Sequence, residues 1–191
     1  DTILHIGNDT IQPSDSVRDL GFFPDSHLSM KVHIARTTRV CFYHLRHLRA
    51  VRRQLGQEVT ARLVSAFVLS RLDYCNALLA ELPNTTIEPL QRVMNAAARL
   101  VLNLKPRDHM TPALQTLHWL PVKYRIQYKL CLLVHRALHS QAPSYLSDIV
   151  TSSAAVPGRS GHRSASHQDL IEPRTKLKFG ERAFSVAGPH Y

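Results

Sequence analysis

The stretch MKVHIARTTRVCFYHLRHLRAVRRQLG, residues 30–56, has the pattern that decides the fold class of this chain. Apolar residues recur in it at spacings of three, four and seven, which is the period of an amphipathic α-helix. The apolar stripe consists of Ile34, Thr38, Cys41, Leu45, Leu48 and Leu55. Gly56 is a typical residue at which a helix ends, so one long helix is expected over this range. Arg52 falls on the stripe, so either its guanidinium extends outward along the alkyl stem or the helix frays there.

The same helix has a second, basic face. At about 100° per residue, four arginines fall within an arc of roughly 80° that lies away from the apolar stripe. They are Arg39, Arg46, Arg49 and Arg53. Glu58 is the only acidic residue between Lys31 and Arg62. Guanidinium groups bind phosphate oxygens in pairs of hydrogen bonds and need no base sequence, so this face suits a nucleic-acid backbone. The alternative, a solvated helix face without a partner, stays open.

Helical periods continue downstream to about residue 150. We expect further helices over residues 58–81, 87–105, 111–117, 121–140 and 144–150. The helix over residues 58–81 has a narrow polar sector, so most of its circumference should be buried. Arg71 lies on that buried arc and should therefore have an acidic or carbonyl partner. Trp119, the single tryptophan, should pack at the corner between two helices. Stacking on a nucleic-acid base is the alternative role of its ring.

The two ends of the chain have other patterns. Gly7-Asn8-Asp9 stands between two short apolar runs and predicts a β-hairpin, the segment SVRDLGFF is a further strand candidate, and Pro24 closes the β region. Residues 151–168 are rich in Ser, Ala, Gly and Pro and indicate a linker. The last residues form a weakly patterned basic tail. The expected fold is thus mainly α, with a β-hairpin over residues 1–30, a helical bundle over 31–150 and an irregular linker and tail over 151–191.

The charge balance favours a polyanionic partner. The 191 residues include 24 Lys and Arg against 14 Asp and Glu, which gives a net charge of +10. Nucleic acid and an anionic membrane surface are the partners that such an excess favours, and a merely basic surface is the alternative. Arg107, Lys123 and Arg125 add basic residues in a loop and at a helix start, and we include them among the expected nucleic-acid contacts. No long uncharged apolar run occurs, so we expect no membrane span.

Motifs of enzymes and metal sites do not occur in the sequence. There is no GxSxG, HExxH, P-loop or GxGxxG, and no Asp-x-Asp pair that could hold two metal ions. The histidine pairs at 44 and 47 and at 135 and 139 lack a visible third ligand. Cys41, Cys75 and Cys131 have no CxxC spacing, so we expect small buried side chains in a reducing, nuclear or cytoplasmic, compartment. Hence we expect no catalytic residue, metal or cofactor.

An ordered series of stretches resembles one known family. These are SVRDLGFFPDSHLSMKVHI, SRLDYCNALLAELP, LQRVMNAAARLV, TPALQTLHWLPVKYRIQYKL, APSYLSDIV and PRTKLKFGERAFSVAGP. In this order they resemble the C-terminal region of the LINE-type, non-LTR retrotransposon reverse transcriptase, over nearly the whole chain. The resemblance implies that residues 1–30 are the last piece of the polymerase palm and that Leu20-Gly21-Phe22 corresponds to the primer-grip hairpin. It implies a thumb for the helices, which in that family hold the template–primer duplex.

The sequence also departs from the family pattern. The Tyr-x-Asp-Asp motif that binds the catalytic metals lies upstream in the family and is not in this chain, and Pro24 interrupts the extended segment of the grip. We therefore expect a non-catalytic, truncated copy that binds the nucleic-acid backbone, with the remainder of a polymerase chain as a further partner. The alternatives are a helical protein-interaction module or inert remnant, and polymerase activity together with a palm on another chain. The preference for DNA or RNA and the oligomeric state stay open.

Overall fold

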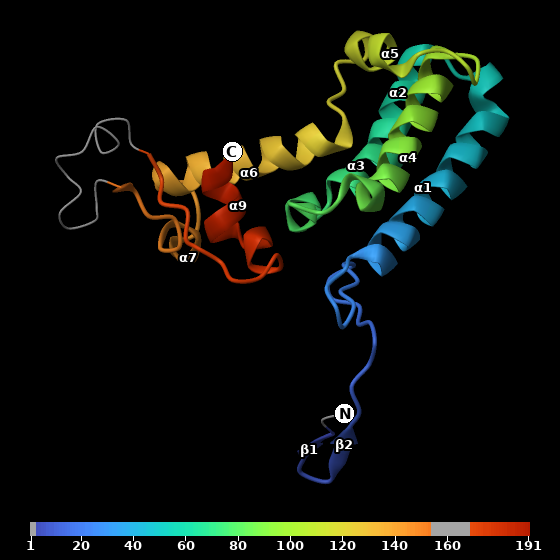
Figure 1. Cartoon of the computed structure of the whole chain (residues 1–191). Coiled ribbons are helices and arrows are strands. Elements are labelled where there is room, and N and C mark those ends of the chain that lie inside the picture. The colour runs from blue at the N-terminus through green and yellow to red at the C-terminus, as the bar shows by residue number, and fades with distance from the viewer. Residues whose placement is uncertain (1–2, 154–168) are drawn as a thin grey trace. The chain divides into compact units, whose positions relative to one another are not determined.

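The computed structural model describes residues 3–153 and 169–191, and these are mainly helical (Figure 1). The strands are β1 (Leu4–Ile6) and β2 (Asp9–Ile11). The α-helices are α1 (Lys31–Val51), α2 (Gln57–Val64), α3 (Ser70–Asp73), α4 (Asn84–Leu102), α5 (Met110–Thr116), α6 (Val122–Leu138), α7 (Ser144–Ser147) and α9 (Phe184–His190). Single turns are the 3-10 segments η1 (Arg52–Gln54), η3 (Asn76–Leu79) and η5 (Gly180–Arg182), and the π-helical segment η2 (Ser65–Leu69). The predicted fold class, mainly α after a short β-hairpin, is confirmed.

Contacts divide the chain into two compact units. The first unit is Asp1–Leu72 with Thr85–Ala113, and the second unit is Asp73–Asn84 with Leu114–Tyr191. The boundaries predicted at residues 30 and 150 are not where this division falls. None of the helices in the described ranges combines the length and apolar character that a bilayer crossing requires.

The N-terminal hairpin forms as the sequence predicts. β1 and β2 pair antiparallel with Ile6 opposite Asp9, so Gly7 and Asn8 form the turn. Gly7 has a φ of 61°, a conformation that favours glycine. Every residue of both strands is exposed, so the hairpin buries neither face.

The segment after the hairpin forms a second, narrower antiparallel loop in place of the predicted strand. Asp19 and Phe22 exchange two backbone hydrogen bonds, of 2.9 and 2.7 Å, around Leu20 and Gly21. Both turn residues have positive φ, 45° and 90°, as a type I′ turn requires. Pro24 does not end the pairing, because its carbonyl accepts a 3.2 Å hydrogen bond from the amide of Val17.

The loop is anchored on α1 through an aromatic contact. Phe22 is buried, and its ring lies 4.5 Å, centroid to centroid, from the ring of His33. His33 is itself only 4% exposed, and its Nδ1 has no hydrogen-bond partner in the described part of the chain. Burial lowers the pKa of His33 below its ordinary value, because the charged imidazolium loses hydration.

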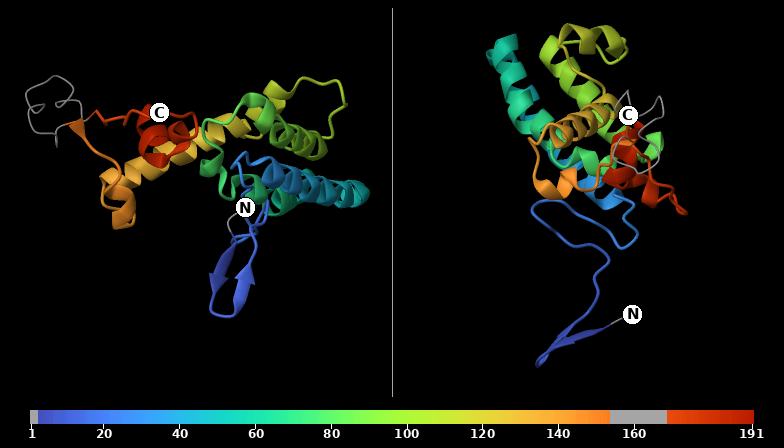
Figure 2. Two further views of the ribbon diagram at one scale, coloured as in Figure 1. Left: turned by 60° about the horizontal axis from the view of Figure 1, so that its bottom comes forward. Right: turned by 90° about the vertical axis from the view of Figure 1, so that its left-hand side faces the viewer.

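The core of the first unit lies between α1, α2 with η2, and α4. Figures 1 and 2 show α1 and α4 side by side. The stripe predicted for α1 supplies Ile34, Cys41, Leu45 and Leu48, all buried. The other helices contribute Val64, Val68, Leu72, Leu90, Val93, Met94, Ala97 and Val101.

α1 is shorter than predicted, and Arg52 follows its last residue. The α-helix stops at Val51, and Arg52 begins the turn η1. Its Nε and Nη2 donate to the carbonyls of Leu100 and Val101, both at 3.0 Å, and its Nη1 donates to the carbonyl of Leu55 at 2.7 Å. The guanidinium thus satisfies carbonyls of the last turn of α4, which have no partner within that helix. Neither outward extension nor fraying describes this residue.

The single helix predicted over residues 58–81 is wrong. α2 gives way to the π-turn η2, then to α3, and Cys75 breaks the chain with a φ of 55° before η3. A π-turn adds one residue, which rotates every later side chain by about 100° relative to an unbroken α-helix. Arg71 is exposed, and the prediction that it lies on a buried arc is also wrong. The expected near-complete burial fails too, since Phe67 is 43% exposed.

The second unit is built on α6. Ile126, Leu130, Val134 and Ala137 form its buried side. α9 packs on α6 so closely that a Cβ on Gly188 would lie 2.9 Å from Cγ2 of Val134. The C-terminal segment is thus more ordered than the irregular tail that the sequence predicted. The predicted linker lies mostly outside the described residues, but Ser153 donates a 2.8 Å backbone hydrogen bond to Asp169 across it.

Trp119 lies between α5 and α6, at the predicted corner. Its amide donates a 2.8 Å hydrogen bond to the carbonyl of Leu114, and the preceding His118 has a φ of 54°. The side chain is half-buried there.

The three cysteines are free and differ in exposure. Cys41 is buried and its Sγ lies 3.9 Å from the carbonyl of Val68, whereas Cys75 is half-buried. Burial raises the pKa of Cys41 to about 11. Cys131 is exposed on α6, so the prediction that all three are buried is wrong for this one.

Candidate nucleic-acid interface

Four exposed arginines form one face of the first unit, which we call the α1 basic face. Arg39, Arg46 and Arg49 belong to α1, and Arg53 belongs to η1. Leu45 and Leu48 are buried one position before Arg46 and Arg49, which turns these two guanidinium groups toward solvent. The structure thus exposes all four arginines that the helical spacing selected.

The arginines of the α1 basic face have no acidic partner within the described ranges. Among residues 3–153 and 169–191, no ion pair and no side-chain hydrogen bond engages any of the four. Other arginines of the first unit differ: Arg62 pairs with Glu58 and Arg92 with Glu88, each at 2.6 Å along one helix. A phosphate can therefore bind the α1 basic face without breaking an ion pair of the protein.

A small hollow adjoins two of these arginines. It has a volume of about 120 Å³ and lies between α1 and α4. Phe42, Leu45, Ala96 and Leu100 form its apolar wall, and Arg46 and Arg49 also line it. Phe42 is 37% exposed, so an aromatic edge and two cations lie on one surface. Such a surface can contact both the charged phosphate and the less polar sugar of a nucleic-acid backbone.

The other basic residues predicted to bind nucleic acid are found in different settings. Arg107 is exposed in the loop after α4, and Lys123 is exposed in the first turn of α6. Arg125 is 20% exposed and forms a two-pronged ion pair with Asp73, in which Nε donates to Oδ1 at 2.7 Å. The guanidinium of Arg125 therefore stabilises the second unit and has little capacity left for a phosphate.

The primer-grip-like residues lie at the tip of the narrow loop. Leu20 is 88% exposed at its apex, whereas Phe22 points back into the contact with His33. Gly21 permits the turn. The tip of the loop therefore exposes one large apolar side chain, that of Leu20, while Phe22 packs on His33 of α1.

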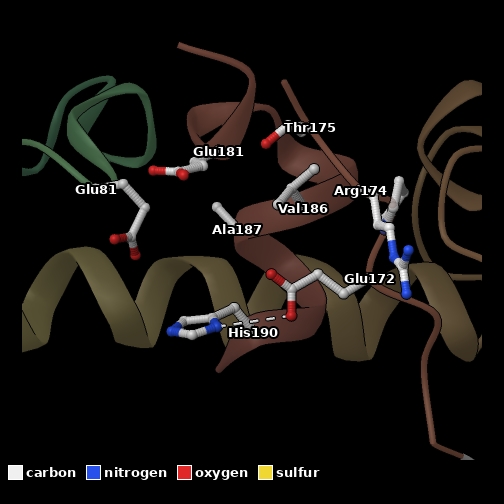
Figure 3. Close-up of a pocket in the computed structure, with 9 residues that line it drawn as sticks. Glu81, Glu172, Arg174, Thr175, Glu181, Val186, Ala187 and His190 are labelled. Carbon is white, nitrogen blue, oxygen red and sulfur yellow. Dashed lines mark ion pairs between the residues drawn. The ribbon is translucent and has the colours of Figure 1, made fainter. Parts of the chain in front are cut away.

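Sequence reasoning missed a hollow of about 570 Å³ in the second unit, lined mainly by residues of its C-terminal segment (Figure 3). We call it the acidic hollow. Figure 3 shows Glu81, Glu172 and Glu181 around it, with Nδ1 of His190 3.8 Å from Oε2 of Glu172. Tyr191 donates its hydroxyl to Glu81, and burial together with this bond raises the pKa of Tyr191. The three carboxylates outnumber the one guanidinium in the lining, that of Arg174, so the charge balance of the hollow disfavours a phosphate.

No local sequence motif indicates the acidic hollow. Its carboxylates come from positions about ninety residues apart, which the packing of the C-terminal segment brings together. The described residues contain no group of three or more His, Cys, Asp or Glu side chains that could hold a metal ion. Arg174 lines the same hollow, so its three carboxylates face one guanidinium group, and no specific chemistry follows from this arrangement.

The comparisons with known proteins identify no relative. No protein-family model matches the chain, and neither a curated protein nor a solved structure matches it.

Proposed function

We propose that this chain is a non-catalytic, thumb-type fragment of a LINE-type reverse transcriptase that binds the nucleic-acid backbone with the α1 basic face. The observation that carries the proposal is the set of four exposed guanidinium groups without an internal ion pair in the described ranges. The ordered resemblance of the sequence to the C-terminal region of that polymerase supports the thumb assignment. The net charge of +10 supports a polyanionic partner.

The dimensions of the α1 basic face suit a strand of nucleic acid. Arg39 and Arg53 are separated by about 20 Å of helix axis at roughly 1.5 Å per residue. That distance corresponds to about six nucleotides at roughly 3.4 Å per nucleotide along one strand. Arg46 and Arg49 lie between them, so the four guanidinium groups can contact four of the phosphates within this span of one strand. Because the contacts are to phosphate, binding should depend strongly on salt and little on base sequence.

The test is the salt dependence of duplex binding. Replacing Arg39, Arg46, Arg49 and Arg53 with Gln should make the slope of log K against log salt less negative by about 3 to 4, at roughly 0.9 per phosphate. The change should be the same for duplexes of different sequence. An unchanged slope in this quadruple variant would show that the α1 basic face is only a solvated surface.

A matched control uses two exposed arginines that already have partners. The double variant Arg62→Gln, Arg92→Gln removes two cations from the same unit, but both are engaged by glutamates in wild type. Its slope should stay close to that of wild type, whereas Arg46→Gln, Arg49→Gln should reduce it by about 2. Equal effects of the two double variants would indicate a general response to net charge and contradict the proposal.

A further inference from the structure

A second hollow, of about 270 Å³, lies within the second unit along α6, with Leu120 and Leu132 among its lining residues, and we call it the α6 hollow. Tyr128, Lys129 and Arg125 line it from α6, Asp73 and Asn76 line it from α3 and η3, and His118 lines it from the corner before α6. Its volume is just below the roughly 300 Å³ at which pockets for drug-sized molecules begin. It therefore has room for one small planar group.

Asn76 is the feature of this hollow that most needs an explanation. Its side chain is among the most buried polar groups of the described chain, at 3% exposure, and it lines the hollow. Its Oδ1 has no hydrogen-bond partner within the described ranges. A buried acceptor without a partner is unfavourable, and a rotation of the amide would let a ligand that donates a hydrogen bond relieve this.

Three charged residues line the α6 hollow: Asp73, Arg125 and Lys129. Asp73 and Arg125 form an ion pair with each other, so the charges on this wall of the hollow largely cancel. Lys129 is exposed and forms no ion pair in the described part of the chain. It leaves one unpaired cation at the rim of the hollow. An anionic group of a ligand would bind there.

Tyr128 adds an aromatic ring next to that cation. The residue is 61% exposed although it lines the hollow, so one part of its ring is open to a ligand. A flat aromatic surface, an amide and a lysine are the three groups that proteins use to bind an unstacked nucleotide: the ring stacks on the base, the amide reads the base edge and the cation holds the phosphate.

We propose that the α6 hollow binds one unpaired nucleotide of a single strand, with the base against Tyr128 and Asn76 and the phosphate at Lys129. An inorganic anion alone would leave Asn76 without a donor and the ring of Tyr128 unused, so the base is the better fit. This inference rests on the proposed nucleic-acid function and extends it from the duplex backbone to a single-stranded segment.

The test compares two tyrosines of one helix. Tyr124 precedes Tyr128 by one turn of α6, is 54% exposed against 61%, and does not line the hollow. The full-length chain is titrated with a labelled, unstructured single strand of about ten nucleotides, a length within the range of single-strand sites. Tyr128→Ala should weaken this binding roughly tenfold, and Tyr124→Ala should leave it unchanged. Binding of a duplex should be unaffected by either change.

Asn76→Leu supplies a second readout that separates binding from stability. Leucine has a similar size and removes the acceptor that lacks a partner, so the midpoint of denaturation should stay the same or rise. Binding of the single strand should still weaken. A large loss of stability with unchanged binding would mean that Asn76 is structural, and would overturn its assignment to the base.

The outcomes distinguish this inference from the proposed function. If Tyr128→Ala and Tyr124→Ala have equal effects, or if inorganic phosphate competes as well as adenosine monophosphate, the nucleotide site is refuted while the α1 basic face is untouched. If the quadruple arginine variant keeps its salt slope but Tyr128→Ala still weakens single-strand binding, the α1 basic face is refuted and the α6 hollow remains.

Discussion

The α1 basic face and the acidic hollow differ in the sign of most of their charged groups and in how the sequence brings those groups together. The α1 basic face covers α1 and the adjoining turn η1, and its four guanidinium groups are engaged by no carboxylate of the described chain. The acidic hollow gathers carboxylates from distant positions, and Tyr191 and His190 already contact two of them. A net charge of +10 therefore describes neither region. Local partners decide whether a charged side chain can bind a ligand.

The largest expected effect compares the two regions directly. The quadruple change of Arg39, Arg46, Arg49 and Arg53 to Gln should weaken duplex binding on the order of 100-fold at moderate salt, because about four counterion-releasing contacts are lost. The triple change of Glu81, Glu172 and Glu181 to Gln should not weaken it, since the acidic hollow does not bind phosphate. A gel-shift titration at one fixed salt concentration measures both. Weakening by the triple variant would show that the acidic hollow takes part in binding.

The next effect compares two adjacent arginines of the same turn. Arg52→Ala should lower the free energy of unfolding by about 1–3 kcal/mol, because carbonyls at the end of α4 lose their donor. Arg53→Ala should change it by less than about 0.5 kcal/mol, since Arg53 is exposed and without an ion pair in the described chain. Urea unfolding followed by circular dichroism measures both. Equal stabilities would contradict the capping role of Arg52.

The smallest effect concerns pH and the support of α1. Burial lowers the pKa of His33, so the unfolded chain binds this proton more readily than the folded one. The stability contributed by neutral His33 is present above the unfolded pKa of about 6.5 and is lost as pH falls below it. In wild type, protonation of His33 should lower the free energy of unfolding as the pH falls from neutral to mildly acidic. His33→Leu should lack this contribution.

The exposed His27 provides the control for this experiment. His27→Leu should retain the pH dependence of wild type, and thermal melting at several pH values compares the three proteins. If His33→Leu loses stability with falling pH as steeply as wild type, another group carries the dependence.

The helical period made much of the first unit predictable. Ile34, Cys41, Leu45 and Leu48 are buried as their spacing required, and the arginines between them are exposed for the same geometric reason. The roles of Arg52 and Arg125 could not be predicted, because their partners Leu100 and Asp73 are about fifty residues away and only packing brings them close.

Two further features depend on interactions that a local pattern does not contain. The π-turn at Ser65–Leu69 shifts the helical phase by one residue, and this moved Arg71 from the expected buried arc to the surface. α9 contains Gly188 and Pro189, which disfavour a helix in isolation, and its contact with α6 compensates for their low propensity. The α6 hollow was missed for the same reason, since its residues lie in separate segments.

The graded burial of the three cysteines has a practical consequence for spectroscopy. Thiol reagents react with the thiolate, so Cys131, exposed on α6, should take up a maleimide dye far faster than Cys41, whose pKa is raised to about 11. Brief labelling would place a fluorophore on the second unit while the core of the first unit stays unmodified. The slower rate of Cys41 labelling, measured by mass spectrometry, would then report how often the first unit opens transiently. No mutation is needed for this measurement.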